Sequence, residues 1–363
     1  MYDVAIIGAG INGTTVAYEF LQENKSVIIF DMDSIASGGS GAAGAFISPK
    51  FSKYGELKEL LQNAFHHSME FYEKNFSNHF TKTKLIHIAK DEKDEEMLKF
   101  FKQNTTLKLN EIDTTYDKES ISLDTAIIDA KPMCEALAGG ANFLKHKVKS
   151  LEYDDGMWII DEQYTAKNVV LATGAYENIV KEPYVKLSGV WGHRIDIKTT
   201  TENEFSLHQY VSISPSKDGV MAIGATHDVH YHPQTSKEPY DIQEGRKELL
   251  EKASRTIKLE NVEVIKDYTG LRSGSYDYMP LVGELVISSE TLACKDIRLQ
   301  MKKQDYSKYV YYPNLYMING NGGYGFVLAP YLAKILKDKI LSDKKIDDRI
   351  VPARFFACWA RRR

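Results

Sequence analysis

Cysteine is scarce in this chain, and its spacing excludes two structural classes. The 363 residues contain three cysteines, Cys134, Cys294 and Cys358, which lie far apart and form neither a CxxC pair nor a Cys/His cluster. A disulfide framework needs an even set of cysteines, and a structural zinc site needs ligands at short spacing. We therefore expect three ordinary thiols and no metal site.

The sequence also lacks a long hydrophobic run. No apolar stretch approaches the roughly 18 residues that a membrane-spanning helix requires, although hydrophobic residues make up 43% of the chain and favour a folded protein with a sizeable core. The first expected strand begins at Tyr2, which leaves no room for the basic and apolar regions of a signal peptide. These absences predict a cytoplasmic protein without a membrane span.

A strong excess of charge is missing as well. The net charge is -4 at pH 7 and the pI is near 6.2, which argues against broad electrostatic binding of nucleic acid. The exception is a basic and aromatic C-terminal tail, 342–363. Its last fifteen residues contain five arginines and three aromatic rings: Arg349, Arg354, Phe355, Phe356, Trp359, Arg361, Arg362 and Arg363. Two interpretations stay open: the rings dock on the body while the arginines remain solvated, or the arginines bind phosphates.

The N-terminus carries a glycine-rich fingerprint between two apolar runs. The first apolar strand leads directly into Gly8, Gly10 and Gly13, and the next apolar run ends at the acid Asp31. Gly8 turns the chain, Gly10 lets the backbone approach a pyrophosphate, and Gly13 lets the following helix, 14–22, pack on the strand. A carboxylate at the position of Asp31 accepts hydrogen bonds from an adenosine ribose. The unit predicts a dinucleotide site; the alternative is a βαβ turn that binds nothing.

Two further elements of small residues follow. The loop after the second strand includes Ser40 and Gly41, and small side chains with permissive backbones let amides face a bound cofactor. A later strand ends in Ala172, Thr173 and Gly174, a turn that resembles the second cofactor contact of flavoproteins with dinucleotide-binding motifs. Two such elements on one chain favour FAD over NAD as the cofactor.

A third glycine-rich element lies near the C-terminus, between an expected strand and an expected helix, 328–340. It contains Gly320, Gly322, Gly323 and Gly325. Backbone amides at a helix N-terminus stabilise negative charge, and negative charge develops on the pyrimidine edge of a flavin when it is reduced. A plain tight turn needs only one or two of these glycines, so the element predicts a flavin-binding junction.

The alternation of strands and helices predicts an α/β fold, with a Rossmann-like FAD-binding domain. This domain is interleaved with a β-rich substrate domain, so the chain as a whole is expected to be α+β. We assign the FAD-binding domain to 1–48, 126–182 and 306–341 and the substrate domain to 49–125 and 183–305. The elements expected in the substrate domain are helices over 57–75, 94–103 and 242–258, a strand over 84–89 and a β-rich stretch over 185–228.

The order of these motifs resembles the D-amino acid oxidase family of FAD enzymes, which includes glycine and sarcosine oxidases. The resemblance covers nearly the whole chain and extends to Gly270-Leu271-Arg272. Within the family, three stretches are most similar to the oxidoreductase domains of the bifunctional enzymes that make 5-methylaminomethyl-2-thiouridine in tRNA. These stretches are 39–50, 272–283 and 352–355. The stretch 322–325 is closer to the amino acid oxidases.

The resemblance implies FAD as the cofactor and oxidation of a carbon–nitrogen bond by hydride transfer to the flavin. It assigns the substrate carboxylate to Arg272, whose permanent charge and planar fork suit that group; the alternative is a surface arginine at a strand end. Tyr324, His193 and Arg194 are further candidates for the pocket wall, against the alternative of packed residues with satisfied polar tips.

Three functions stay open at this point. The first is oxidation of the carboxymethylaminomethyl group on the wobble uridine of tRNA, the second is oxidation of free glycine, sarcosine or a D-amino acid, and the third is flavin binding without catalysis. Arg272 does not separate the first two, because both substrates carry a carboxylate beside the amine. We expect an amine substrate with a carboxylate and, in the first case, tRNA as a partner.

Overall fold

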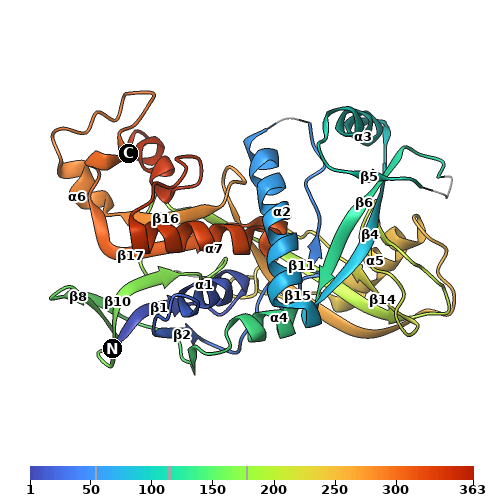
Figure 1. Cartoon of the computed structure of the whole chain (residues 1–363), viewed down its shortest axis with the longest axis horizontal. Coiled ribbons are helices and arrows are strands. Elements are labelled where there is room, and N and C mark those ends of the chain that lie inside the picture. Colours follow the sequence, from blue (N-terminus) through green and yellow to red (C-terminus); the bar gives the residue numbers. More distant parts are fainter. Residues whose placement is uncertain (54, 113–115, 177–178) are drawn as a thin grey trace.

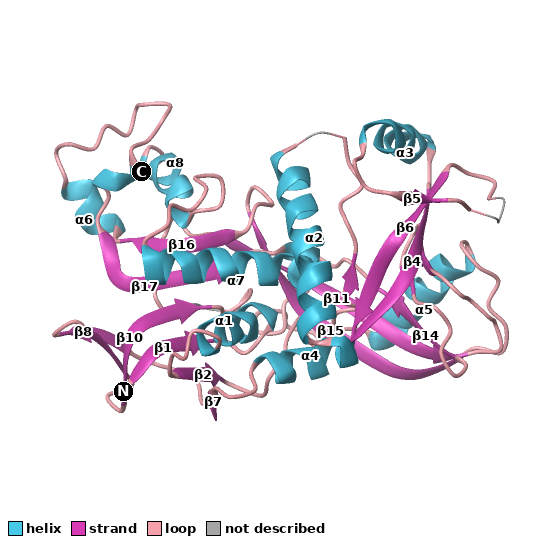
Figure 2. Cartoon of the chain, viewed as in Figure 1, coloured by secondary structure: helices cyan, strands magenta, loops and turns pink. Residues whose placement is uncertain are grey.

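The computed structural model describes residues 1–53, 55–112, 116–176 and 179–363, which form two large sheets with helices packed against them (Figure 1). The first sheet has eight strands and the second has nine. The sheets lie toward opposite ends of the long axis of the molecule, and both chain termini lie at the end formed by the first sheet (Figures 1 and 2).

The first sheet is mainly parallel. In order across the sheet, its strands are β16 (Leu281–Val286), β17 (Tyr311–Asn319), β10 (Tyr164–Leu171), β1 (Tyr2–Ile7), β2 (Val27–Asp31) and β7 (Asn142–Lys145), with the hairpin of β8 (Leu151–Asp154) and β9 (Met157–Ile160) beside β10. Neighbours from β17 to β7 pair in parallel, whereas β16 is antiparallel. Continuous apolar runs such as β1 suit parallel strands because both faces of the sheet are covered.

Helices cover one face of this sheet and the β8–β9 hairpin covers the other. The helices that share a buried cluster with the sheet are α1 (Ile11–Leu21), α2 (Glu56–Asn75), α4 (Ala130–Leu137) and α7 (Gly325–Ser342). Val4 and Ile6 of β1 point into this cluster, whereas Ala5 and Ile7 pack with Trp158 on the opposite face. The alternation follows from the two-residue period of a strand.

Helix α2 packs across α7 and supplies hydrogen bonds near the proline inside α7 (Figure 1). Pro330 has no amide hydrogen, so the carbonyl of Phe326 loses its helical partner. The hydroxyl of Tyr72 on α2 donates to that carbonyl at 3.0 Å, and the hydroxyl of Ser68 donates to the carbonyl of Val327 at 2.7 Å. Both side chains are fully buried. Helix α2 therefore fixes the first turn of α7, next to the glycine-rich junction.

The second sheet is mainly antiparallel. Its strands, in order, are β15 (Glu263–Ser275), β11 (Leu187–Lys198), β14 (Val220–Gly224), β13 (Ser212–Ile213), β12 (Ser206–His208), β4 (Phe80–Ile88), β6 (Ser120–Ile128) and β3 (Phe46–Ile47), with β5 (Leu109–Asn110) beside β6. Only β12 and β4 pair in parallel among the described strands of this sheet. Leu249 and Ala253 of α5 (Ile242–Ser254) pack on Ile195 of β11. Helix α3 (Glu92–Asn104) packs over β6 through Leu98 and Phe101.

The predicted fold class is confirmed, and the helices expected over 57–75, 94–103 and 328–340 lie within α2, α3 and α7. The helix expected over 242–258 corresponds to α5, which ends earlier, at Ser254. The fingerprint helix begins at Ile11 instead of residue 14, because Gly10 is its N-cap. Two strands belong to the sheet of the other expected domain: β16 joins the first sheet although it falls within 183–305, and β3 joins the second sheet although it falls within 1–48. Strand β6 also runs across the expected boundary between 125 and 126. We keep the two-domain division as a proposal, with these two strands exchanged.

The aromatic part of the C-terminal tail docks on the body, as one of the two interpretations predicted. The 3-10 helix Pro352–Phe355 and α8 (Phe356–Ala360) follow each other, and Phe356 is fully buried with Tyr184 and Tyr309. The short helix α6 (Ser288–Ala293) lies at the same end (Figure 2). Across the described part of the chain, no helix combines the length and apolar character needed to span a membrane.

Candidate active site

A cavity of about 1080 Å³ lies between the two sheets. Its wall includes the carboxyl ends of the parallel strands β1, β2, β10 and β17, the edge where open α/β sheets bind ligands. The predicted site residues that line it are Gly8, Gly10, Asp31, Ser40, Ala172, Thr173, Gly174, Arg272, Gly322, Gly323, Tyr324 and Gly325. Gly13, Gly41 and Gly320 lie outside this lining. The structure thus gathers four distant segments of the sequence around one space.

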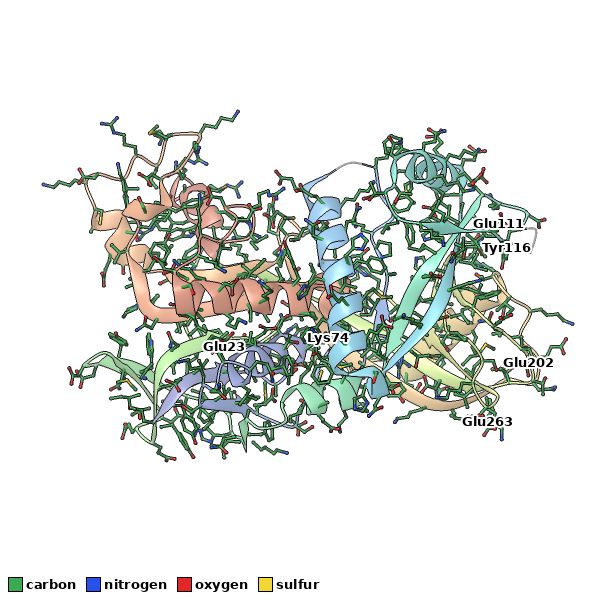
Figure 3. All side chains as sticks on the ribbon, in the orientation of Figure 1. Glu23, Lys74, Glu111, Tyr116, Glu202 and Glu263 are labelled. Carbon is green, nitrogen blue, oxygen red and sulfur yellow. The ribbon has the colours of Figure 1, made fainter. Side chains whose placement is uncertain are left out.

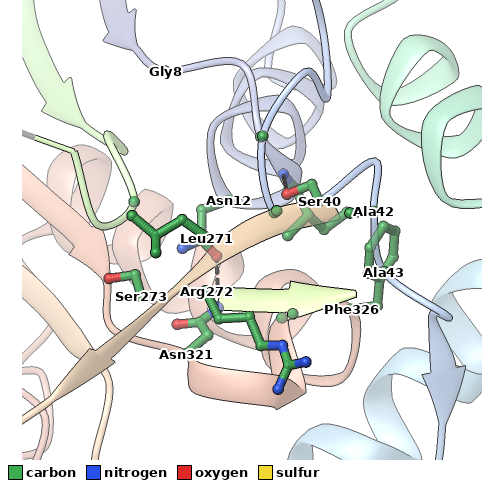
Figure 4. A pocket seen from close by; sticks show the side chains of 18 of the residues that line it. Gly8, Asn12, Ser40, Ala42, Ala43, Leu271, Arg272, Ser273, Asn321 and Phe326 are labelled. Carbon is green, nitrogen blue, oxygen red and sulfur yellow. Dashed lines mark hydrogen bonds between the residues drawn. The ribbon is translucent and has the colours of Figure 1, made fainter. Parts of the chain in front are cut away.

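The fingerprint glycines hold β1, α1 and β10 close together. Gly8 has a φ of 111°, and a Cβ there would collide with the carbonyl of Ala172. A Cβ at Gly13 would collide with the carbonyl of Gly8, so Gly13 sets the packing of α1 on the turn from outside the cavity. The amide of Ile11, at the start of α1, donates to Oγ of Ser40 at 2.9 Å. Ser40 therefore ties the small-residue loop to the helix N-terminus (Figure 4).

Asp31 closes β2 at the cavity wall. Its Oδ2 accepts a hydrogen bond from the amide of Ala9 at 2.8 Å, and its Oδ1 accepts one from the amide of Asp33 at 2.9 Å. These bonds fix the carboxylate at the end of the strand while each oxygen keeps a further lone pair for a ligand hydroxyl. Gly41 has a structural role, because a Cβ there would collide with the carbonyl of Ala36.

The glycine-rich junction presents a polar and sterically open wall. Gly320 and Gly322 have φ values of 76° and 57°, which explains two of the glycines by backbone conformation. A Cβ at Gly323 would meet no atom within 4 Å. Nδ2 of Asn321 donates to Oδ1 of Asn12 at 2.7 Å (Figure 4), but Oδ1 of Asn321 is buried without a hydrogen-bond partner. A buried acceptor left unpaired beside open space indicates a ligand donor at this wall.

Arg272 extends from β15 along the cavity wall (Figure 4). Its Nη2 donates to the carbonyl of Thr226 at 2.7 Å, and a Cβ at Gly192 on the neighbouring strand would collide with the guanidinium. Burial lowers the pKa of Arg272, and among the described residues no carboxylate pairs with it. Taking a guanidinium out of water without an anion is costly. The site is therefore prepared for an anionic group from a ligand.

Tyr324 also lines the cavity, at the end of the glycine-rich junction. Burial raises the pKa of its hydroxyl, so the side chain is a neutral phenol near pH 7. Nζ of Lys50 lies 5.5 Å from the centre of its ring. The phenol offers one donor and one acceptor to a bound group without adding charge.

His193 and Arg194 lie outside the cavity lining, contrary to the sequence-based expectation. Strand alternation gives the reason: Gly192 faces the cavity, so His193 faces the other side, where its ring lies against Gly245 of α5. Nε2 of His193 lies 2.9 Å from Oδ1 of Asp267 on β15. Arg194 points to the same side as Gly192, but its guanidinium donates to the carbonyl of Ala43 at 2.9 Å and stacks on Tyr268 at 3.8 Å. Both residues support the structure around the cavity.

The far end of the cavity, which the second sheet forms, was not predicted from the sequence. His208 lies there with its Nδ1 2.8 Å from Oγ of Ser212, and burial next to His87 lowers its pKa to about 4. The ring centres of the two histidines are 4.8 Å apart. No local pattern marks His208, since it closes a three-residue strand. Its pairing with β4, more than a hundred residues earlier, creates the environment.

The features of the cavity fit FAD. Close backbone approach at Gly8 and Gly10, the helix N-terminus after Gly10, and Asp31 beyond it suit a pyrophosphate and a ribose. The unpaired Oδ1 of Asn321 and the open wall at Gly323 suit a polar ring edge at the other glycine-rich junction. The cavity slightly exceeds the roughly 300–1,000 Å³ typical of small-molecule pockets, as a dinucleotide together with a substrate requires.

Comparison with known proteins agrees with this geometry. The tRNA 5-methylaminomethyl-2-thiouridine biosynthesis bifunctional protein MnmC of Campylobacter jejuni (strain NCTC 11168) is 24% identical over 97% of this chain, and that of Legionella pneumophila (strain Lens) is 22% identical over 96%. The chain spans 58% and 56% of the length of these two relatives.

Solved structures share the fold over nearly their whole length. Glycine oxidase from Bacillus cereus superposes with a TM-score of 0.72 at 20% identity, covering 95% of this chain and 96% of that chain. Glycine oxidase from Geobacillus kaustophilus gives 0.73 at 18% identity, with 98% and 97% covered. The family model for FAD dependent oxidoreductases matches residues 3–339. The chain therefore belongs to this family, DAO, and is an FAD-dependent oxidoreductase.

Proposed function

We propose that this enzyme oxidises the carbon–nitrogen bond of a glycine-like amine, and that its substrate is the carboxymethylaminomethyl group on the wobble uridine of tRNA. The observation that carries the amine part is Arg272, a partly buried guanidinium at the cavity wall. Its partner is a backbone carbonyl, and no carboxylate of the described residues pairs with it. The tRNA part is supported by the tRNA-modifying relatives that align with 96–97% of the chain.

The chemistry that FAD supplies when bound is acceptance of a hydride from the carbon beside the amine nitrogen. Arg272 holds the carboxylate on that carbon by a charge-assisted, two-pronged hydrogen bond and so limits how the carbon can lie in the cavity. Tyr324 presents a neutral phenol from the adjoining wall. Loss of the hydride from the neutral amine leaves an iminium ion, which becomes the imine when its N–H proton passes to water. Water then hydrolyses the carbon–nitrogen double bond to a free amine and a carbonyl compound. No protein base is required when the amine enters in its neutral form.

A second candidate, oxidation of a free amino acid such as glycine, is favoured by one specific observation. The glycine oxidases match this chain over 95–98% of both lengths, whereas the chain spans little more than half of the tRNA-modifying relatives. A reaction on tRNA also fits the cytoplasmic location that the sequence analysis expects.

The direct test is anaerobic reduction of the bound flavin. We expect tRNA that carries carboxymethylaminomethyl-uridine to bleach the flavin absorption, whereas glycine, sarcosine and D-alanine at millimolar concentration should react far more slowly. Rapid bleaching by a free amino acid but not by the tRNA would support the second candidate. Absence of bleaching by the tRNA and by all three free amines would contradict both candidates. Mass spectrometry of tRNA nucleosides from cells lacking the gene gives an independent answer.

A further inference from the structure

The end of the molecule that carries both termini contains a second, smaller hollow. It has a volume of about 460 Å³ and lies between the loop 295–308 and the C-terminal tail. Its lining includes three cations with exposed side chains, Lys302, Lys303 and Arg361. This hollow, which we call the basic groove, shares no lining residue with the active-site cavity.

The structure divides the arginines of the tail into two groups. Arg354 makes hydrogen bonds of 2.8 Å from Nε and Nη2 to the two carboxylate oxygens of Asp277, and Arg349 pairs with Asp347 and Glu59. These two arginines anchor the tail. The last three, Arg361, Arg362 and Arg363, are exposed, and none of them forms an ion pair with a described carboxylate. Of the five tail arginines that one interpretation of the sequence left in solvent, only these three are therefore exposed and free of ion pairs with described carboxylates.

The tail and the loop are fixed to each other, so their charges form one surface. Nη1 of Arg361 donates to the carbonyl of Leu299 at 3.4 Å, and Phe356 is fully buried just before it in the chain. Gln304 holds the loop by donating from Nε2 to the carbonyl of Met301 at 2.5 Å, and its Oε1 accepts from the hydroxyl of Tyr309 at 2.9 Å. The groove is thus bounded on both sides by hydrogen-bonded backbone.

Charge is concentrated here in strong contrast to the rest of the chain. The loop 295–308 and the stretch 347–363 together carry ten lysines and arginines and four acids, one of which, Asp348, lines the groove, whereas the whole chain has a net charge of -4. The end opposite the groove exposes acids, among them Glu111, Glu202 and Glu263 (Figure 3). A molecule polarised in this way attracts and orients a polyanion by its basic end.

We propose that the basic groove binds the phosphodiester backbone of the substrate tRNA. This inference rests on the proposed function, since it names the surface that would hold the RNA outside the active-site cavity. Cations spread over two neighbouring segments suit a row of phosphates, because each neutralised phosphate releases counterions and adds to the affinity. The planar guanidinium of an arginine can also donate two parallel hydrogen bonds to phosphate oxygens. A free phosphate ion has the same chemistry but engages one point instead of a row.

The test uses the FAD-loaded full chain and two charge-matched double variants. Lys302→Glu/Lys303→Glu changes the groove, and Lys247→Glu/Lys258→Glu makes the same charge change on α5 and the loop after it, at the opposite end (Figure 1). We expect the groove variant to bind tRNA about 10- to 100-fold more weakly at 50 mM salt. The slope of log affinity against log salt should flatten by about one unit for each phosphate that the groove no longer neutralises. The control variant should stay within about threefold of the parent.

The outcomes separate this proposal from the proposed function. Equal tRNA affinity and slope for the groove variant and the parent would overturn the groove, even if the tRNA still bleaches the flavin. Weakened binding by the groove variant alone would support the groove, even if the tRNA fails to bleach the flavin and the proposed function falls. Displacement of tRNA by 10 mM inorganic phosphate, or binding of the groove to anionic vesicles but not to tRNA, would also overturn it.

Discussion

Arg272 owes its place at the cavity wall to a glycine on the neighbouring strand. Its guanidinium lies over Gly192 and is held by the carbonyl of Thr226. Replacing it by alanine should lower kcat/KM for flavin reduction by roughly 30- to 1000-fold, which corresponds to about 2 to 4 kcal/mol for a charge-assisted paired contact. Arg272→Lys should recover only part of this loss, because an ammonium does not reproduce the planar fork. Stopped-flow absorbance measures the rates, and flavin content serves as the control.

Gly192→Ala gives a second variant for the same hypothesis. Its methyl group would collide with the flexible end of the Arg272 side chain, not with backbone, so stability should change little while the guanidinium moves. We expect a raised KM for carboxylate-bearing amines with unchanged FAD content. Normal kinetics in both Arg272→Ala and Gly192→Ala would assign the carboxylate to another residue.

His208 makes the stability of the protein depend on pH. Burial, together with nearby His87, lowers its pKa from 6.5 to about 4, while Asp94 acts in the opposite direction. Between these values the unfolded chain binds a proton that the folded chain does not, so the free energy of unfolding should fall as pH falls from 6.5 to 4. The loss attributable to this group should reach about 3 kcal/mol.

Urea unfolding at several pH values measures this dependence. The variant His208→Gln lacks the titrating group and should lose correspondingly less stability over the same interval, whatever its stability at pH 7. Parallel pH curves for the two proteins would show that His208 does not keep a lowered pKa.

At the scale of secondary-structure elements, alanine at two glycines should affect different properties: stability at Gly13 and FAD affinity at Gly323. Gly13 lies inside α1, where helix propensity alone predicts that alanine stabilises by about 1 kcal/mol. The collision of a Cβ with the backbone carbonyl of Gly8 outweighs this gain, because α1 cannot retreat without opening the βαβ unit. We expect Gly13→Ala to reduce the free energy of unfolding by about 1 to 3 kcal/mol. Urea titration of the FAD-free protein measures the change.

Gly323→Ala is the matched variant at the other glycine-rich junction. Its methyl group would meet no protein atom within 4 Å and would occupy open space at the cavity wall. The FAD-free protein should therefore keep its stability within about 0.5 kcal/mol, since the packing of its neighbours does not change. FAD affinity, followed by flavin fluorescence, should decrease. Unchanged FAD affinity would mean that this wall lies away from the cofactor.

The same elements show what the sequence could and could not predict. The turn after β1, the helix and Asp31 follow one another within thirty-one residues, so their spacing encodes the fingerprint locally. The position of His193 depended on strand parity, and a sequence with histidine beside glycine does not state which of the two faces the cavity. The role of Tyr72 depended on Pro330, some 250 residues later. Such partners meet only through tertiary packing.

At the scale of the whole molecule, the C-terminal tail covers the edge of the first sheet. The amide of Val282 on β16 donates to the carbonyl of Ile350 at 2.8 Å, and the tail continues over this strand through Ala353 and Phe356. Burial raises the pKa of the Asp277 carboxyl, but the hydrogen bonds from Arg354 outweigh burial and hold this pKa below its ordinary value. An uncovered edge strand exposes unpaired backbone groups and invites association. The tail therefore has a structural role that is separate from any role in binding tRNA.

Two truncations test that separation. Removing 361–363 takes away only exposed arginines, so the free energy of unfolding should stay within about 0.5 kcal/mol and flavin reduction by a small amine should be unchanged. Removing 352–363 also takes away the buried ring of Phe356, whose removal alone should cost about 3 to 5 kcal/mol, and uncovers β16. We expect the longer truncation to unfold at clearly lower urea concentration and to aggregate. Equal stability of the two truncations would show that the tail is not part of the folded core, because neither would then have removed anything that packing holds in place.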